Sequence, residues 1–284
     1  MKFGVAYHTG HYGVDPDAII AYARHAEACG FESLYLPEHV ALYRGATMGA
    51  VAIDPTAPIV DPLDCLAFVA AATDRILLGT GVLQLPHHHP VILAKRLATI
   101  DALSKGRMRL LTVGLGGLPG EAAAVGIDFA TRGRRADEAI DAMRLLWAGD
   151  ERGVGFAGEF FSFVDLCSFP KPHASRTLPI HVAGSTRRAA RRAGRRGDGY
   201  FPGGMIGRQE RLAQIGLMRT TARESGRDAD ALEVTRWGAI DMSVEDVATQ
   251  AADGVTRLVV AAASLDPQEQ RDQLSAFAER HGPG

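Results

Sequence analysis

Short apolar runs alternate with amphipathic segments along the first half of the chain. Four apolar runs have the length of buried strands: residues 3–7, 33–37, 75–82 and 107–113. Three segments between them show helical spacing, with a proline near each start: residues 17–29, 61–72 and 90–103. A long loop spans residues 41–60. Because the strands are apolar on both faces, their β-α-β-α-β-α-β order indicates a parallel sheet covered by helices on both sides.

The second half continues this alternation after one irregular excursion, in which residues 160–164 form a small expected strand. Further expected strands are residues 179–183, 199–201, 233–240 and 257–261. Further expected helices are residues 136–148, 186–194, 208–225, 244–252 and 267–280. If the excursion is an insertion, the pattern gives eight strand and helix units, which predicts an α/β fold: a (β/α)8 TIM barrel with an insertion segment, as one domain over residues 1–284. An open doubly wound sheet is the alternative.

Composition narrows the class of protein. The chain is 46% hydrophobic and 23% charged, which is typical of a globular domain that buries a large core. Its three cysteines are scattered, which disfavours disulfides and a zinc site. Without an export signal or a long apolar run, we expect a cytoplasmic protein with no membrane partner. The formal net charge of −2 gives no general attraction to nucleic acid, so we expect no nucleic-acid partner.

Candidate chemistry gathers where the expected strands end. In a parallel barrel the active site lies at the carboxyl ends of the strands, so the residues that follow each strand are the ones of interest. They are Glu38 and His39 after the second strand, Thr80, Gly81, Val82 and Gln84 at the third, Gly114, Leu115, Gly116 and Gly117 at the fourth, and Ala183, Gly184, Ser185 and Thr186 at a later one. We therefore expect one polar and glycine-rich rim.

His39 is the candidate acid or base of this rim. An imidazole beside a carboxylate exchanges protons near neutral pH, and Glu38 is its neighbour in sequence. The structural alternative is that Glu38 and His39 point in opposite directions and bind loop backbone. Gly114–Gly117 lacks the spacing of a dinucleotide fingerprint; its glycines either let backbone approach a flat ring or form a tight turn.

Residues 184–186 are a candidate anion site. They follow a strand and open a helix, so backbone N–H groups, hydroxyls and the helix dipole converge there. The alternative is that Ser185 or Thr186 only caps the helix. Arginines then recur in pairs at four-residue spacing: Arg187, Arg188, Arg191, Arg192, Arg195 and Arg196. This arginine stripe is either a solvated outer face, a nucleic-acid surface, which the lack of interleaved aromatics disfavours, or a contact for a polyanionic ligand.

Two common kinds of site lack support in the sequence. His87, His88 and His89 are adjacent and cannot all face one metal ion, and no nearby acid or cysteine completes a set, so we expect no metal. The Gly-x-Ser-x-Gly turn of serine hydrolases is also absent from the sequence.

Several segments in order resemble the luciferase-like monooxygenase superfamily, most closely its F420-dependent oxidoreductase branch. They include residues 35–40, 73–82, 89–95, 104–107 and 197–200, together with Pro170 to Pro172 and Gly184-Ser185. The resemblance covers nearly the whole chain, and the order and spacing of the segments make it specific. It implies a luciferase-like TIM barrel with an insertion segment and a deazaflavin, coenzyme F420, across the strand ends.

The resemblance also assigns roles to the rim. Glu38 and His39 would lie beside the reactive ring, and His39 is the expected catalytic residue. Gly81-Val82 matches a strand bulge that is often a non-prolyl cis peptide behind the ring. Gly114, Leu115 and Gly116 would approach the ring. The segment from Ala183 to Thr186 would approach the phosphate of the cofactor. One departure is Gly117, which stands where sugar-phosphate dehydrogenases of this family carry a glutamate, so that particular activity is in doubt.

The function expected on this basis is an F420-dependent oxidoreductase that transfers hydride between the deazaflavin and a small organic substrate. Two alternatives stay open: an FMN-dependent monooxygenase on the same barrel, and a non-catalytic deazaflavin-binding protein. Because related barrels are often dimers, we also expect a homodimer.

Overall fold

The chain folds into a closed barrel of eight parallel strands. A computed structural model describes residues 1–203 and 206–282. The strands are β1 (Lys2–Ala6), β2 (Ser33–Leu36), β5 (Leu77–Thr80), β7 (Met108–Gly114), β10 (Ile180–Gly184), β11 (Gly199–Pro202), β12 (Glu233–Gly238) and β13 (Arg257–Val260). They pair in that order, and β13 returns to pair with β1, which closes the barrel. The predicted (β/α)8 barrel is confirmed, and the open-sheet alternative is excluded.

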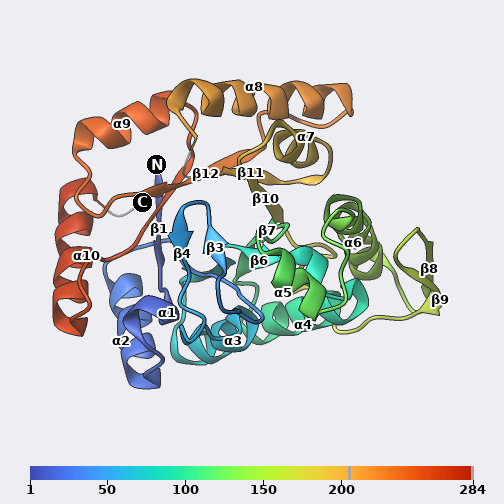
Figure 1. The fold of residues 1–284 in the computed structure, drawn as a ribbon, viewed down its shortest axis with the longest axis horizontal. Helices are drawn as coiled ribbons and strands as arrows, with labels where there is room; N and C mark the ends of the chain where they lie inside the picture. Colours follow the sequence, from blue (N-terminus) through green and yellow to red (C-terminus); the bar gives the residue numbers. More distant parts are fainter. Residues whose placement is uncertain (204–205, 283–284) are drawn as a thin grey trace.

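Helices cover the outside of the barrel, as Figure 1 shows. They are α2 (Pro16–Ala28), α3 (Pro62–Ala72), α4 (Pro90–Leu103), α6 (Arg132–Ala148), α7 (Arg187–Arg196), α8 (Arg208–Glu224), α9 (Val244–Ala252) and α10 (Pro267–His281). Three of them begin with an aspartate followed by proline: the side chains of Asp15, Asp61 and Asp266 accept hydrogen bonds from first-turn N–H groups. Proline suits the next position because its missing N–H has no partner there.

Short elements decorate the loops, and some correct the sequence-based expectation. They are α1 (Thr9–Tyr12), β3 (Thr47–Met48), β4 (Val51–Ala52), β6 (Leu83–Gln84), a 3-10 turn (Leu85–His87), α5 (Pro119–Ala124), β8 (Val154–Ala157) and β9 (Ser162–Leu166). The expected loop at residues 41–60 contains the antiparallel β3–β4 hairpin. The expected strand at residues 160–164 is displaced to β9, which pairs with β8 in a hairpin of its own. Such short exposed strands lack the apolar run that marks a barrel strand.

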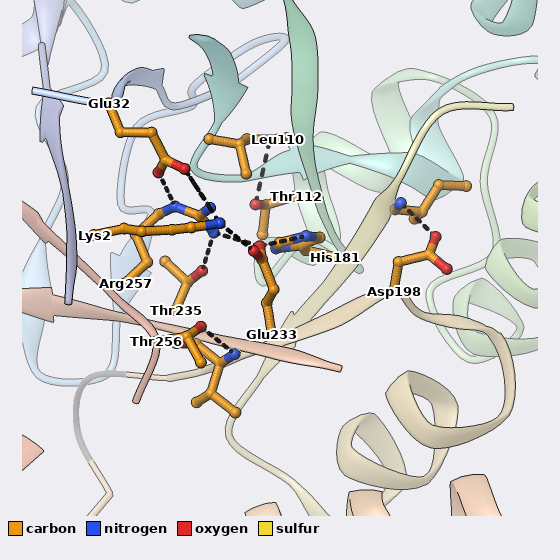
Figure 2. Close-up of polar contacts among 12 residues, drawn as sticks. Lys2, Glu32, Leu110, Thr112, His181, Asp198, Glu233, Thr235, Thr256 and Arg257 are labelled. Atoms are coloured by element: carbon orange, nitrogen blue, oxygen red, sulfur yellow. Dashed lines mark hydrogen bonds and ion pairs between the residues drawn. The ribbon is translucent and has the colours of Figure 1, made fainter. Parts of the chain in front are cut away.

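A polar network fills the amino-terminal end of the barrel, opposite the rim expected to carry the chemistry (Figure 2). Arg257 is almost fully buried and pairs with Glu32 and Glu233. Lys2 also binds Glu233, with 2.7 Å between Nζ and Oε1. Buried charges are tolerated when they are paired and hydrogen-bonded, so this network closes the base of the barrel.

Apolar side chains fill the space between the barrel and its helices in one large cluster. Trp147 is its largest fully buried member, and its indole N–H donates to the Ala94 carbonyl at 3.0 Å, which joins α6 to α4. Among the described residues, no helix combines the length and apolar character needed to cross a membrane.

Candidate functional site

A cavity of about 390 Å³ opens at the carboxyl ends of β7, β10 and β11. The residues lining it are Val82, Gly114, Leu115, Gly116, Gly117, Arg132, Ala183, Gly184, Ser185, Thr186, Ala189, Phe201, Pro202, Gly203 and Trp237. Eight of them are residues that the sequence analysis singled out for the cofactor. The structure therefore brings three separate expected segments together at one end of the barrel.

Glycines shape the floor of this cavity. The Gly81–Val82 peptide is cis, as the sequence resemblance led us to expect. A Cβ atom at Gly114 would lie 2.7 Å from Cγ2 of Val82, so only glycine fits there without displacing the valine. Gly116 adopts a φ of +74°, a conformation that L side chains rarely take. A Cβ atom at Gly116 would lie 2.5 Å from Oε1 of Gln84, so this glycine lets the Gln84 side chain lie against the backbone.

The segment Gly184–Thr186 forms one side of the cavity at the start of α7. Gly184 has a φ of +142°, and the Thr186 side chain accepts a hydrogen bond from Ala189 N at 3.2 Å. Thr186 is thus the N-cap that the structural alternative anticipated. The cap does not exclude an anion site, because the free N–H groups and the dipole of a helix N-terminus attract negative charge.

Of the described residues that line the cavity, only Arg132 has a charged side chain. Its guanidinium stacks 3.6 Å from the centre of the Phe129 ring, and NH1 donates to the Phe129 carbonyl. Its Nε is buried and has no hydrogen-bond partner among the described residues. Burial lowers the pKa of Arg132, yet arginine stays charged in proteins. A buried N–H without an acceptor, in a cavity wall, is suited to an anionic ligand.

The arginine stripe serves mainly to join helices. Arg192 pairs with Asp137 at 2.6 Å, and Arg196 with Asp141 at 2.9 Å, so two rungs of the stripe bind α7 to α6. Arg187 approaches Glu210 of α8 at 3.5 Å. Arg188, Arg191 and Arg195 are exposed. Our interpretation of the stripe as a ligand contact loses its support, because intramolecular carboxylates already occupy half of the arginines.

His39 is held by a buried carboxylate that the sequence analysis left without a role. Nδ1 of His39 lies 3.0 Å from Oε2 of Glu121, on α5. The other oxygen of Glu121 accepts from the backbone N–H of Val40 at 2.6 Å, and the Gln84 amide donates to Oε2 at 3.1 Å. Burial alone would raise the pKa of Glu121, but the hydrogen bonds from His39 and Gln84 outweigh it and hold that pKa below its ordinary value. Glu121 is therefore a carboxylate that orients His39.

Glu38 faces away from this pair. Its carboxylate accepts from Gln84 N and from Nε2 of His88, the latter at 2.7 Å, and the side chain is buried. The Gln84 amide also donates to the Glu38 carbonyl at 3.0 Å. This matches the alternative in which Glu38 and His39 point in different directions. Gln84 joins both acids into one network, in which Glu38 positions the loop that carries His39.

Other residues that we expected at the site, such as Thr80 and Gly81, have structural contacts within the barrel. Thr80 is buried, and its hydroxyl donates to the Thr112 carbonyl at 2.8 Å and accepts from Thr112 N at 3.0 Å, which ties β5 to β7. Gly81 leaves room for Trp237, whose ring would lie 3.3 Å from a Cβ there. Of the neighbouring histidines, His89 caps α4. His87 is half-buried, with no partner for Nδ1 among residues 1–203 and 206–282.

Sequence reasoning left Arg132, Glu121 and Gln84 without roles. Glu121 and Gln84 follow the same strand ends as the expected rim residues, so their position was a usable signal. Arg132 is the first residue of α6. Its place in the sequence does not indicate a role, because that role depends on residues that lie near it only in the folded chain.

Comparison with known proteins places these features in a family. The luciferase-like monooxygenase family matches residues 1–282. An F420-dependent glucose-6-phosphate dehydrogenase from Beutenbergia cavernae is 32% identical over 255 residues, which cover 81% of this chain and 71% of the relative. An uncharacterised protein from Mycobacterium tuberculosis is 34% identical over 209 residues, which cover 71% of this chain and 72% of that protein.

Solved structures share the fold at lower identity. An F420-dependent secondary alcohol dehydrogenase in complex with an F420–acetone adduct superposes with a TM-score of 0.80 at 18% identity, covering 99% of this chain and 98% of that chain. Monooxygenase RslO1 from Streptomyces bottropensis superposes with a TM-score of 0.77 at 22% identity, covering 99% and 98%. At these identities the likeness shows the barrel architecture.

Proposed function

Because this chain belongs to the luciferase-like monooxygenase family, we propose that it is an oxidoreductase that binds coenzyme F420 and transfers hydride to or from a small organic substrate. Relatives and structural neighbours in the family include F420-dependent oxidoreductases and monooxygenases. The observation that carries the choice is the cavity at the strand ends, which combines a glycine floor with Arg132, a partly buried arginine whose buried Nε has no hydrogen-bond partner among the described residues.

The cavity fits a deazaflavin with an anionic tail. Gly114, Gly116 and Gly117 line its floor, and a Cβ atom at Gly117 would meet nothing within 4 Å, so a ring would find open space beside Gly117. Ser185, Thr186 and the start of α7 would hold the phosphate, with Arg132 as the cation beside it. When bound, coenzyme F420 supplies a ring carbon that gives or takes a hydride without oxygen. The chain itself has to orient the ligand and move the proton.

His39 is the group proposed to move that proton. A carboxylate only accepts hydrogen bonds, so the bond to Glu121 places a proton on Nδ1 and leaves Nε2 for the substrate oxygen. This arrangement is the one by which an acid orients a catalytic histidine and stabilises its charged form. Glu38 acts through Gln84 and His88, as a positioning residue.

The carboxylate of Glu121 is relevant to whether this chain could be a sugar-phosphate dehydrogenase, the activity that Gly117 puts in doubt. Gly117 supplies no acid at the position where sugar-phosphate dehydrogenases of the family carry glutamate. Glu121 instead brings a carboxylate to His39 from the following helix. We propose that its role is to position His39, so it does not restore the missing proton donor, and the substrate need not be a sugar phosphate.

A fluorescence titration with coenzyme F420 and with FMN tests the proposed cofactor. We expect saturable, micromolar or tighter binding of F420 and much weaker binding of FMN. Tight FMN binding without F420 binding would favour the FMN-dependent monooxygenase. Tight F420 binding with no turnover on any carbonyl or alcohol would favour the non-catalytic binding protein. We retain the homodimer as a proposal, which sedimentation measures in the same samples.

A further inference from the structure

The segment that follows His39 is an unusually apolar surface loop. Residues 40–53 contain one charged side chain, Arg44. Four of its large apolar side chains are exposed to solvent: Val40 (49%), Tyr43 (36%), Met48 (55%) and Val51 (68%). Exposed apolar residues scattered singly need no explanation, but a run of them beside a candidate active site indicates a binding surface.

The tip of this segment stands clear of the barrel. Gly45 and Gly49 form its turns with φ values of +80° and +62°, and a Cβ atom at either position would meet nothing within 4 Å. The base is anchored, because Ala46 is buried and its carbonyl accepts from Ile53 N at 2.9 Å. The exposed side chains of the hairpin are therefore not needed to hold the segment in place.

The same segment is joined directly to the acid that orients His39. Glu121 accepts hydrogen bonds from Val40 N at 2.6 Å and from Ala41 N at 3.3 Å. The Tyr43 ring lies against Gly120, where a Cβ would be 2.5 Å from it. An occupant of the first part of the segment, at residues 40–43, would thus lie next to the acid that orients His39.

We propose that residues 40–53 form the apolar wall of the substrate site, and that the substrate is an uncharged compound whose apolar chain extends from the reacting carbon over Tyr43, Met48 and Val51. This inference rests on the proposed function, because it places the reacting carbon at His39. The segment offers one exposed cation and no buried polar group for a phosphate. Burying each added methylene on such a wall raises affinity by about twofold to fourfold.

Binding of straight-chain 2-alkanones, from butanone to 2-decanone, tests the substrate class. Isothermal titration calorimetry is performed on the full chain with and without coenzyme F420. We expect affinity to rise by about twofold to fourfold per methylene. The double variant Met48→Ser, Val51→Ser should flatten this dependence while the Kd for F420 stays the same. Val164→Ser is the matched control, because Val164 is 78% exposed on the remote β8–β9 hairpin.

Several outcomes overturn the inference. Affinity that does not rise with chain length, an unchanged slope in the double variant, or tighter binding of glucose 6-phosphate than of any alkanone each contradict it. Loss of a dimer in the double variant with an unchanged slope would assign the segment to a second copy of the chain. Failure of the wild-type protein to bind F420 counts against the proposed function. The alkanone series without F420 still tests whether residues 40–53 bind an apolar chain.

Discussion

Nδ1 of His39 lies 3.0 Å from Oε2 of Glu121, although the two residues are 82 positions apart in the chain. Glu121 is fully buried and also binds the backbone of the loop that carries His39. One carboxylate therefore fixes both the tautomer of the imidazole and the position of its loop.

Replacing His39 should remove turnover and spare cofactor binding. In His39→Ala we expect kcat to fall by about 10²- to 10⁴-fold, the usual contribution of a positioned acid or base. The Kd for F420 should change by less than about threefold, since His39 is not among the residues that line the cavity. His89→Ala is the control, because His89 only caps α4. Unchanged turnover in His39→Ala would remove His39 from the chemistry.

Glu121→Gln should lower kcat/KM by about 10- to 100-fold, the range seen when a group that orients a histidine is lost. The loss should lie in kcat while the Kd for F420 changes little, because neither Glu121 nor His39 is among the residues that line the cavity. Steady-state kinetics and an F420 titration measure this split, which a general structural defect would not produce. Glu138→Gln is a matched control: Glu138, on α6, also accepts backbone N–H groups, those of Glu159 and Phe160, but its carboxylate does not bind His39.

Arg132→Met should weaken binding of F420 selectively. Loss of a hydrogen bond to a charged group costs about 1.5–3 kcal/mol, which corresponds to about 10- to 150-fold in Kd. The deazaflavin that lacks the phosphate and its tail should bind equally to both proteins. Arg134→Met is the control two residues away, because Arg134 is exposed and pairs with Glu159. Equal loss of affinity for both deazaflavins would show that Arg132 supports the ring site and not the tail.

The base of the barrel should lose stability in acid in two stages. Burial lowers the pKa of His181 to about 4, against an ordinary value of about 6.5. Between these values the unfolded chain binds a proton that the folded chain does not. The stability that uncharged, buried His181 contributes is therefore fully present above pH 6.5. It is lost as the pH falls towards 4, and the loss is on the order of 3 kcal/mol. Urea unfolding at pH 7, 5.5 and 4.5 measures it.

Glu233 extends the loss to lower pH. Burial alone would raise its pKa, but the hydrogen bond and charge of Arg257 hold that pKa at about 2. The stability that this carboxylate contributes is present above its ordinary pKa, about 4.3, and disappears as the pH falls towards 2. His181→Gln should flatten the dependence between pH 6.5 and 4 only. A dependence in that range that persists in His181→Gln would mean that other groups cause it.

The barrel could be predicted from the sequence because strands such as β1 and β2 are short, largely apolar runs, and because helices such as α3 carry their own start signal, here Asp61 followed by Pro62. The β3–β4 hairpin could not, because its strands are short, exposed and lack a core face. The cavity segments could be predicted because parallel strands bring their carboxyl ends together. This prediction needs only the order of the strands and helices along the chain.

Side-chain partners were harder to predict than segments. The bond between His39 and Glu121 depends on how α5 packs over the loop, which local sequence does not encode. The arginine stripe shows the opposite case. Arg192 and Arg196 are four residues apart on α7, and so are their partners Asp137 and Asp141 on α6. Matching spacings on two neighbouring helices of the barrel were present in the sequence and indicate a helix–helix contact.

Transfer of deuterium from the cofactor tests the central claim most directly. The protein is incubated under argon with reduced F420 that carries deuterium at the reactive ring carbon, together with the 2-alkanones. The account predicts one deuterium on the carbinol carbon of a 2-alkanol product, its rate independent of oxygen and lost in His39→Ala. An alkanol without deuterium would contradict it, as would a product that forms only in a parallel incubation with reduced FMN in air and carries an oxygen atom from O2.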